Sequence, residues 1–137
     1  MGKIIKEVIK MAISNYLENK ILNHTLNNVP YTQPEVVYLA LFKSDPTDDN
    51  IGEEVNGNGY VRKPITFNEP SNGSISNSVA ITMPVATGDW GTITHIGIMD
   101  NLVNGNLLYY GQLDIHQNIQ SNNQLFIDIN QLTITLD

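Results

Sequence analysis

The stretch "WGTITHIGIMDN", residues 90–101, holds the side chains best suited to chemistry. It contains Trp90, the single tryptophan of the chain, together with His95 and Asp100. A histidine oriented by an aspartate can act as a general base when a nucleophile lies within hydrogen-bond reach. Here no serine nucleophile or acidic residue stands at a defined spacing, and Asp100 falls at a strand end, where it favours a turn. We therefore interpret His95 as a structural residue and Trp90 as a side chain that closes the end of the core.

Other kinds of catalytic or metal site find little support in the residues. The chain has no cysteine, which excludes thiolate nucleophiles, disulfides and cysteine-based zinc sites. Five acidic residues gather within 45–54, but their spacing is not that of an EF-hand. We interpret them as a solvated loop and keep a weak calcium site as the alternative. No Lys-Ser/Thr pair follows the glycines of 57–73, so there is no phosphate loop. The sequence predicts no catalytic residue, no cofactor and no metal.

The 137-residue chain is acidic and rich in amides. It contains 18 Asn and 6 Gln, whereas only 15% of its residues are charged. The net charge of −7 is uneven: residues 1–28 carry +2 and the remainder carries −9. An acidic body repels phosphates, so we expect no nucleic-acid partner. No apolar run approaches the ~18 residues of a membrane span, and no cleavage site of a signal peptide is present, so we expect a soluble protein.

The first part of the chain has apolar residues at helical spacing. No glycine or proline occurs between Lys3 and Val29, which predicts one unkinked helix over 3–27, roughly 36 Å long at 1.5 Å per residue. Its apolar face is wide, and two readings remain open: the face packs on the domain's own sheet, or part of it contacts a partner. With its lysines, the helix is also the expected attachment element. The residues of the expected assembly interface are Ile5, Ile9, Ile13, Tyr16 and Leu17 of the helix and Tyr110 of the body.

After Pro34 the pattern becomes that of short strands separated by turns. Six stretches are rich in β-branched, aromatic or alternating apolar residues: 36–43, 60–67, 78–86, 92–99, 106–114 and 124–137. We expect a mainly β (α+β) fold, an antiparallel β-sandwich of about six to eight short strands preceded by one long N-terminal α-helix. It forms a single domain, 1–137, with a helix at 1–28 and a body at 35–137. The predicted core residues are Leu39, Leu41, Trp90, His95, Ile96 and Ile98.

Two details of strand phase also follow from the pattern. On residues 92–99, alternation places Ile93, His95, Gly97 and Met99 on one face. In the last stretch the apolar positions change parity, which predicts a bulge or break near Asn130 and Gln131.

Four consecutive stretches resemble a known family. They are "VYLALFKSDPTD", "EEVNGNGYVRKPITF", "SNSVAITMPVATGDWGTITHIGIMDN" and "GNLLYYGQLD". Together they are similar to small phage and prophage structural proteins, often labelled tail-fibre or minor virion proteins. The most specific parts are residues 39–42, residues 59–62 and the Trp90–Ile98 strand, whereas Met99 stands where an aromatic residue is usual and Lys63 where a Gln is usual. The resemblance implies one compact β-rich domain behind an N-terminal helix, and no enzymatic activity.

The resemblance implies a non-enzymatic virion component, made in the cytoplasm of a host bacterium and assembled on the head, collar or tail. Its partners are other virion proteins, and we expect a homo-oligomer, with a trimer favoured. The alternative is a tail-fibre-associated module that binds a receptor or a carbohydrate. Aromatic side chains that could stack on a sugar are Tyr31, Tyr60, Tyr109 and Tyr110.

Overall fold

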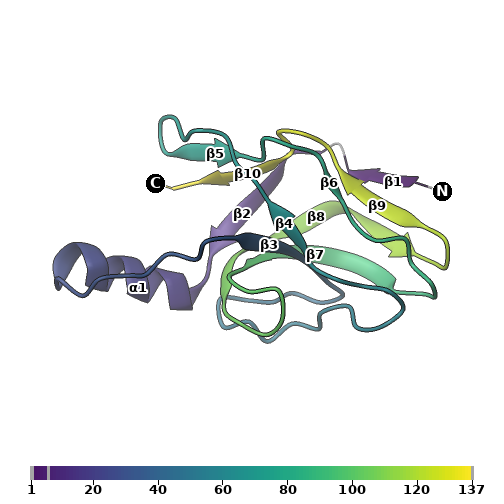
Figure 1. Cartoon of the computed structure of the whole chain (residues 1–137), viewed down its shortest axis with the longest axis horizontal. Helices are drawn as coiled ribbons and strands as arrows, with labels where there is room; N and C mark the ends of the chain where they lie inside the picture. The colour runs from purple at the N-terminus through teal and green to yellow at the C-terminus, as the bar shows by residue number, and fades with distance from the viewer. Residues whose placement is uncertain (1, 6, 137) are drawn as a thin grey trace.

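The computed structural model describes residues 2–5 and 7–136; Met1, Lys6 and Asp137 lie outside the described residues. Ten strands and one helix follow one another in these residues (Figure 1). Their bounds are β1 (Gly2–Ile5), β2 (Ile9–Ile13), α1 (Asn15–Leu26), β3 (Val37–Phe42), β4 (Lys63–Ile65), β5 (Ser74–Ser76), β6 (Ile81–Thr82), β7 (Gly91–Met99), β8 (Leu107–Ile119), β9 (Gln124–Ile127) and β10 (Leu132–Thr135).

The strands form a sandwich-like β fold with two sheets. The larger sheet has the order β4-β3-β7-β8-β2-β10-β5, and the smaller sheet has the order β1-β9-β6. Most pairs are antiparallel as expected, but β1 lies parallel to β9 and β2 lies parallel to β10. The larger sheet also curls back on itself. Residues 66–68 bond to 76–78, with Asn68 N–H 2.9 Å from the Ser76 carbonyl, so the segments beyond β4 and before β5 meet.

The predicted helix over residues 3–27 is wrong, and so is the predicted start of the body at residue 35. Strands β1 and β2 occupy the first half of that stretch, and the helix has only 12 residues. Ile5 and Ile9, four residues apart, fit a helical period by coincidence because they belong to two different strands. Within β2 the buried and exposed residues alternate, as in a strand that covers a core. The hydrogen bonds of both strands come from partners at the far end of the chain.

Helix α1 begins and ends at short polar side chains. The Ser14 Oγ accepts a hydrogen bond from the Leu17 N–H at 3.2 Å, which satisfies one of the free amides of the first turn. At the other end Asn27 caps the helix, and Asn28 follows with φ 57°, the left-handed conformation that commonly stops a helix. The helix therefore covers only the stretch between these two signals.

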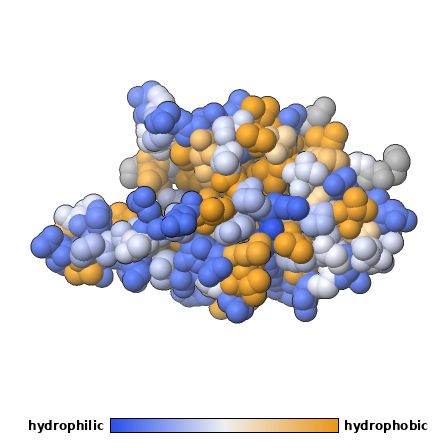
Figure 2. All heavy atoms as spheres, in the orientation of Figure 1, coloured by the Kyte–Doolittle hydropathy of each residue, from blue (hydrophilic) through white to orange (hydrophobic). Residues whose placement is uncertain are grey.

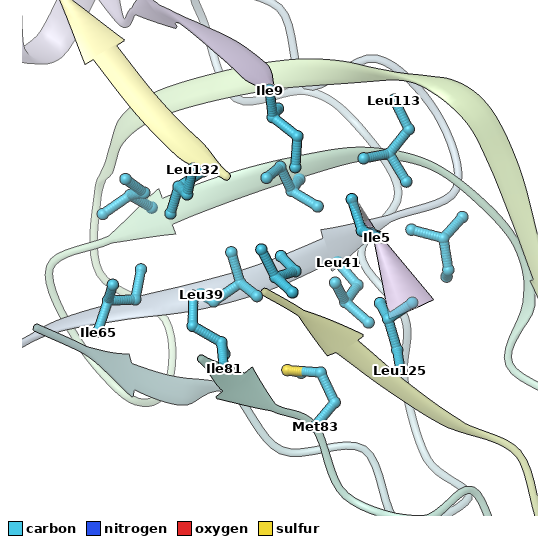
Figure 3. Packing of buried hydrophobic residues seen from close by; sticks show 14 of the residues in the cluster. Ile5, Ile9, Leu39, Leu41, Ile65, Ile81, Met83, Leu113, Leu125 and Leu132 are labelled. Atoms are coloured by element: carbon cyan, nitrogen blue, oxygen red, sulfur yellow. The ribbon is translucent and has the colours of Figure 1, made fainter. Parts of the chain in front are cut away.

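The core lies between the curled sheet and the smaller sheet (Figure 3). Leu39, Leu41, Trp90, Ile96 and Ile98 are buried in it as predicted, whereas the predicted core residue His95 is only partly buried and lies outside this cluster. A smaller buried cluster, which contains Phe42, lies apart from this core. The larger core also holds residues from β1, β2, β9 and β10, namely Ile5, Ile9, Met11, Leu125, Ile127, Leu132 and Ile134. The first and last strands thus belong to the same core as the middle of the chain.

Irregular backbone decides the outcome of the two predictions about strand phase, one for residues 92–99 and one near Asn130. The register of β7 against β8 shifts between Ile93 and His95, so Ile93 joins Ile96 in the main core. The predicted shared face of Ile93 and His95 is therefore wrong. The predicted break near Asn130 is found: β9 and β10 belong to different sheets, and Asn130 between them has φ 65°.

Asparagine has a structural role in the turns. Among the described residues, eight non-glycine positions have positive φ, and seven of them are asparagine. Asparagine tolerates this left-handed conformation better than other side chains. A good part of the asparagine content thus serves turn geometry.

Candidate assembly site

Helix α1 and the return segment 27–36 form an arm that projects from the body, at the left in Figure 1. From Glu18 to Val36 no residue of this arm is buried. Leu22 and Leu26 are 53% and 75% exposed, although both are large apolar side chains on a helix. An isolated helix shorter than about 12–15 residues is marginal in water, so the arm depends on contacts made at its root or with a partner.

The root of the arm is fixed to the body. The Ser14 Oγ donates to the Leu107 carbonyl at 2.6 Å, and the Ser14 N–H donates to the Leu108 carbonyl at 2.9 Å. The Asn15 side-chain amide donates to Asp49 Oδ1 at 2.8 Å, and Leu17 is buried. These contacts join the first turn of the helix to β8 and to the acidic loop, residues 45–54. The direction of the arm is therefore set by the body.

The return segment folds back along the helix. The Tyr31 N–H donates to His24 Nδ1 at 3.2 Å, and the Val29 N–H donates to the Asn23 carbonyl at 3.0 Å. Partial burial raises the pKa of Tyr31, with smaller contributions from the neighbouring Tyr16 and Asp100. The arm is therefore a hairpin of helix and extended chain whose far end makes few contacts with the body.

Beside the arm lies an apolar groove, which opens where the curled sheet separates β10 and β5 from β3, β7 and β8. Its volume is about 390 Å³, and no charged side chain is among its described lining residues. Figure 2 shows hydrophobic residues gathered over the middle of this face, above the projecting arm. The side chains that line the groove are Val37, Phe67, Pro70, Ser74, Ile75, Ile98, Leu108, Tyr109, Ile134 and Leu136, with Gly73 at its edge.

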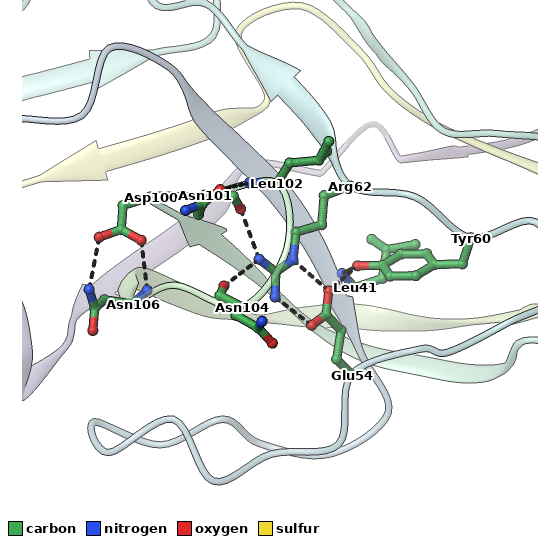
Figure 4. Close-up of polar contacts among 9 residues, drawn as sticks. All are labelled: Leu41, Glu54, Tyr60, Arg62, Asp100, Asn101, Leu102, Asn104 and Asn106. Carbon is green, nitrogen blue, oxygen red and sulfur yellow. Dashed lines mark hydrogen bonds and ion pairs between the residues drawn. The ribbon is translucent and has the colours of Figure 1, made fainter.

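A buried ion pair lies elsewhere, among the loops at the edge of β3 (Figure 4). Arg62 Nε and Nη2 donate to the two carboxylate oxygens of Glu54, at 2.8 and 2.7 Å. Its Nη1 donates to the carbonyls of Asn101 and Asn104, at 2.8 and 2.7 Å. The Tyr60 hydroxyl donates to Glu54 Oε2 at 2.5 Å. These donors and acceptors are used within the chain, so the cluster connects loops and does not present a binding group.

His95 and Asp100 do not meet. Asp100 accepts bonds from the Asn106 N–H at 2.7 Å and from its side-chain amide at 3.0 Å. The His95 side chain is 12% exposed, with Nδ1 2.8 Å from the Thr94 hydroxyl and Nε2 3.8 Å from Asp45 Oδ1. Burial lowers the pKa of His95. Within residues 2–5 and 7–136, no three His, Cys, Asp or Glu side chains gather where they could hold a metal ion.

The residues expected at an assembly interface do not form one surface. Ile5 and Ile9 are buried in the core, and Leu17 is buried at the root of the arm. Ile13 and Tyr16 are half-buried near the same root, and the Tyr110 hydroxyl donates to the Asp48 carboxylate. The exposed leucines of the arm are absent from the sequence-based interface; a helix start at Ser14, readable as a capping residue, would have drawn attention to them.

The four tyrosines considered for sugar stacking make different contacts. Tyr60 packs edge-on against Trp90, with ring centroids 5.5 Å apart, and bonds to Glu54. Tyr109 lines the groove and Tyr110 bonds to the acidic loop, whereas Tyr31 lies on the return segment. They do not make a common aromatic platform.

A β-rich body with a fixed projecting arm and an uncharged apolar groove has the features of a structural protein that assembles with others. Residues 12–135 match the family model described as Podophage GP4 fiber I protein gp80, and the chain belongs to this family of phage fibre proteins. No curated protein matches the chain. Among the described residues, the helix is too short and too polar to traverse a bilayer. The resemblance to phage tail-fibre proteins that the sequence shows is thus confirmed.

Proposed function

We propose that this chain is a non-enzymatic component of a phage fibre, which joins the other virion proteins through its arm and displays the β-rich body outward. Family membership supports the virion as its place. The arm supports the mode of attachment, since it extends beyond the core and its direction is set by the root.

The observation that carries the proposal is the exposure of Leu22 and Leu26 on a helix whose buried contact is Leu17. Exposed apolar side chains on an ordered projection mark a contact surface, because burying each of them gains about 1.5–3 kcal/mol. If the arm only covered the core, Leu22 and Leu26 would pack against the body.

The charge argument for attachment does not carry over from the sequence. Lys3 and Lys10 lie on β1 and β2 within the body, and Lys6 lies outside the described residues. The arm itself carries Glu18, Lys20 and Glu35, so it is not a basic segment. Apolar contact therefore replaces electrostatic docking as the basis of the proposed attachment.

Removal of residues 1–27 would delete two core strands, so the test uses surface substitutions. The double variant Leu22→Glu/Leu26→Glu keeps the helix and removes its apolar side chains. A phage lacking the gene is complemented with the variant, and copies per purified particle are counted by quantitative mass spectrometry. The matched control is Val103→Glu/Ile115→Glu, which alters two side chains of similar exposure on the body.

The proposal predicts that the arm variant is folded by circular dichroism but depleted in particles, whereas the control enters at wild-type copy number. Wild-type incorporation of the arm variant would show that the arm is not the attachment element. Equal loss with both variants would point to a general effect of added charge.

A further inference from the structure

The arm and the apolar groove have complementary surfaces. We propose that the groove of one copy takes the arm of a second copy, with Leu22 and Leu26 inserted among its aliphatic side chains. This inference rests on the proposed function and names the partner of the arm within the fibre. The groove volume of about 390 Å³ lies in the range of clefts that bury a ligand, ~300–1,000 Å³.

The arm of the same chain does not fill its own groove. Bonds from Ser14 and Asn15 to β8 and the acidic loop hold the first turn, and the arm leaves the body from there. Between the arm and β10 lies a second hollow of about 620 Å³, lined by Ile13, Ile21, Leu22 and Leu136 among others. Because Leu136 borders both hollows, an incoming arm meets apolar side chains on both sides of the end of β10.

Charge favours a second copy at this place. Copies with a net charge of −7 repel one another, so contact between them requires surfaces with few acidic groups. Between residues 19 and 34 the single formal charge is that of Lys20. Around the groove, whose lining is uncharged, Glu69 precedes Pro70 and Glu35 lies two positions before Val37. The outer part of the arm, residues 19–34, therefore brings the positive charge of Lys20 towards an apolar groove flanked in the sequence by two carboxylates.

The contact is between two different surfaces, the arm of one copy and the groove of the next. Repeated contacts of this kind form a closed ring when the rotation from each copy to the next brings the last copy back to the first. The number of copies follows from the angle between arm and groove, and the same pair of surfaces recurs at every contact.

Absence of cysteine allows a direct test in the full chain. Leu26→Cys is prepared in one isotopically labelled batch and Leu136→Cys in an unlabelled batch, and the two are mixed and oxidised. The proposed contact predicts a disulfide-linked mixed dimer whose yield is well above that of the control mixture. The matched control mixes Leu26→Cys with Ile115→Cys, an exposed position on β8 outside the groove.

A second experiment measures self-association by analytical ultracentrifugation. Leu22→Glu/Leu26→Glu should weaken it by at least about tenfold, since two buried leucines are lost. Lys20→Glu should weaken it by about two- to fivefold, as expected for an exposed ion pair. Adding Glu69→Lys to Lys20→Glu should restore association, which a nonspecific effect of charge would not do.

Two results would overturn the inference. One is a mixed crosslink with Leu136→Cys no stronger than that with Ile115→Cys. The other is a chain that stays monomeric at its highest soluble concentration. Neither result contradicts the proposed function, because that function is tested by entry of the arm variant into particles.

Discussion

Arg62 and Glu54 form a two-point ion pair in which each carboxylate oxygen accepts one bond from the guanidinium, at 2.8 and 2.7 Å. Eight residues separate the two in the chain, and the Arg62 side chain is only 8% exposed. The remaining bonds of Arg62 reach the loop between β7 and β8. Arg62 therefore joins the β3–β4 loop, which also carries Glu54, to the β7–β8 loop.

Arg62→Ala should destabilise the fold by about 3 kcal/mol, because it leaves a largely buried carboxylate without its partner. Urea unfolding followed by fluorescence of Trp90 measures the loss. The control is Lys43→Ala, which breaks the Lys43–Glu53 pair at 3.3 Å. Glu53 is 69% exposed, so this change should cost less than about 1 kcal/mol. Similar losses in both variants would contradict the structural role of the Arg62 pair.

Tyr60 should resist ionisation until the protein unfolds. Burial raises its pKa far above the ordinary value, with a further rise from the Glu54 carboxylate. The pKa of Tyr110 is raised to about 12, mainly by burial and then by Asp48. A raised folded pKa means that the stability contributed by each phenol is present below pH ~10 and is lost as the pH rises through the folded value.

Tyrosinate absorbance during alkaline titration measures both effects. Tyr110→Phe should remove the step near pH 12, whereas Tyr60→Phe should remove the tyrosine that ionises together with unfolding. A Tyr60 that titrates near pH 10 in the folded chain would contradict its buried bond to Glu54.

His95 should make stability fall on acidification. Burial lowers its folded pKa, opposed by the Asp45 carboxylate and assisted by His116. A lowered folded pKa means that the unfolded chain binds the proton more tightly, so stability is present above pH ~6.5 and is lost as the pH falls towards the folded value. His95→Gln should flatten this dependence between about pH 7 and 5. A slope in His95→Gln equal to that of the wild type would contradict the role of the buried imidazole.

Gly111→Ala should destabilise the sheet by about 2 kcal/mol through overpacking. A Cβ at this position would lie 2.5 Å from the Lys10 carbonyl oxygen and 2.8 Å from Met11 Sδ, and the carbonyl belongs to the paired strand β2. The comparison is Gly57→Ala, where φ is +81° and nothing lies within 4 Å. Only backbone strain of about 1 kcal/mol applies there. Thermal unfolding of the two variants side by side ranks these effects, and a greater loss at Gly57 would contradict the close approach of β8 to β2.

The sequence revealed the central strands because their signals are local. β3, β7 and β8 are runs of β-branched and apolar residues bounded by turns, and turn residues such as Asn104 and Gly105 have the positive φ that their types favour. The change of parity before β10 marked a break for the same reason. Strand β5 was missed because it has only three residues, inside a segment that reads as a turn.

The N-terminal strands could not be found in this way. Ile5 and Ile9 fit a helical spacing, and the parallel partners that override it begin at Gln124 and Leu132, more than 115 residues along the chain. The groove has the same origin, since its lining comes from separate segments brought together by the curl of the sheet. The Arg62–Glu54 pair likewise has no signature in residue type or spacing.

The parallel pairing of β1 with β9 and of β2 with β10 has a consequence for the birth of the protein on the ribosome. β10 begins at Leu132, so the parallel partner of the second strand emerges from the ribosome more than 115 residues after that strand. Until then Ile5, Ile9 and Met11, which are buried in the finished core, lack the strands β9 and β10 that pair with β1 and β2. Pairing across the whole chain is slow and leaves such strands open to aggregation while they wait. The body thus stays open until β10 has emerged, and a chain terminated before Leu132 lacks the strand that joins β2 to β5.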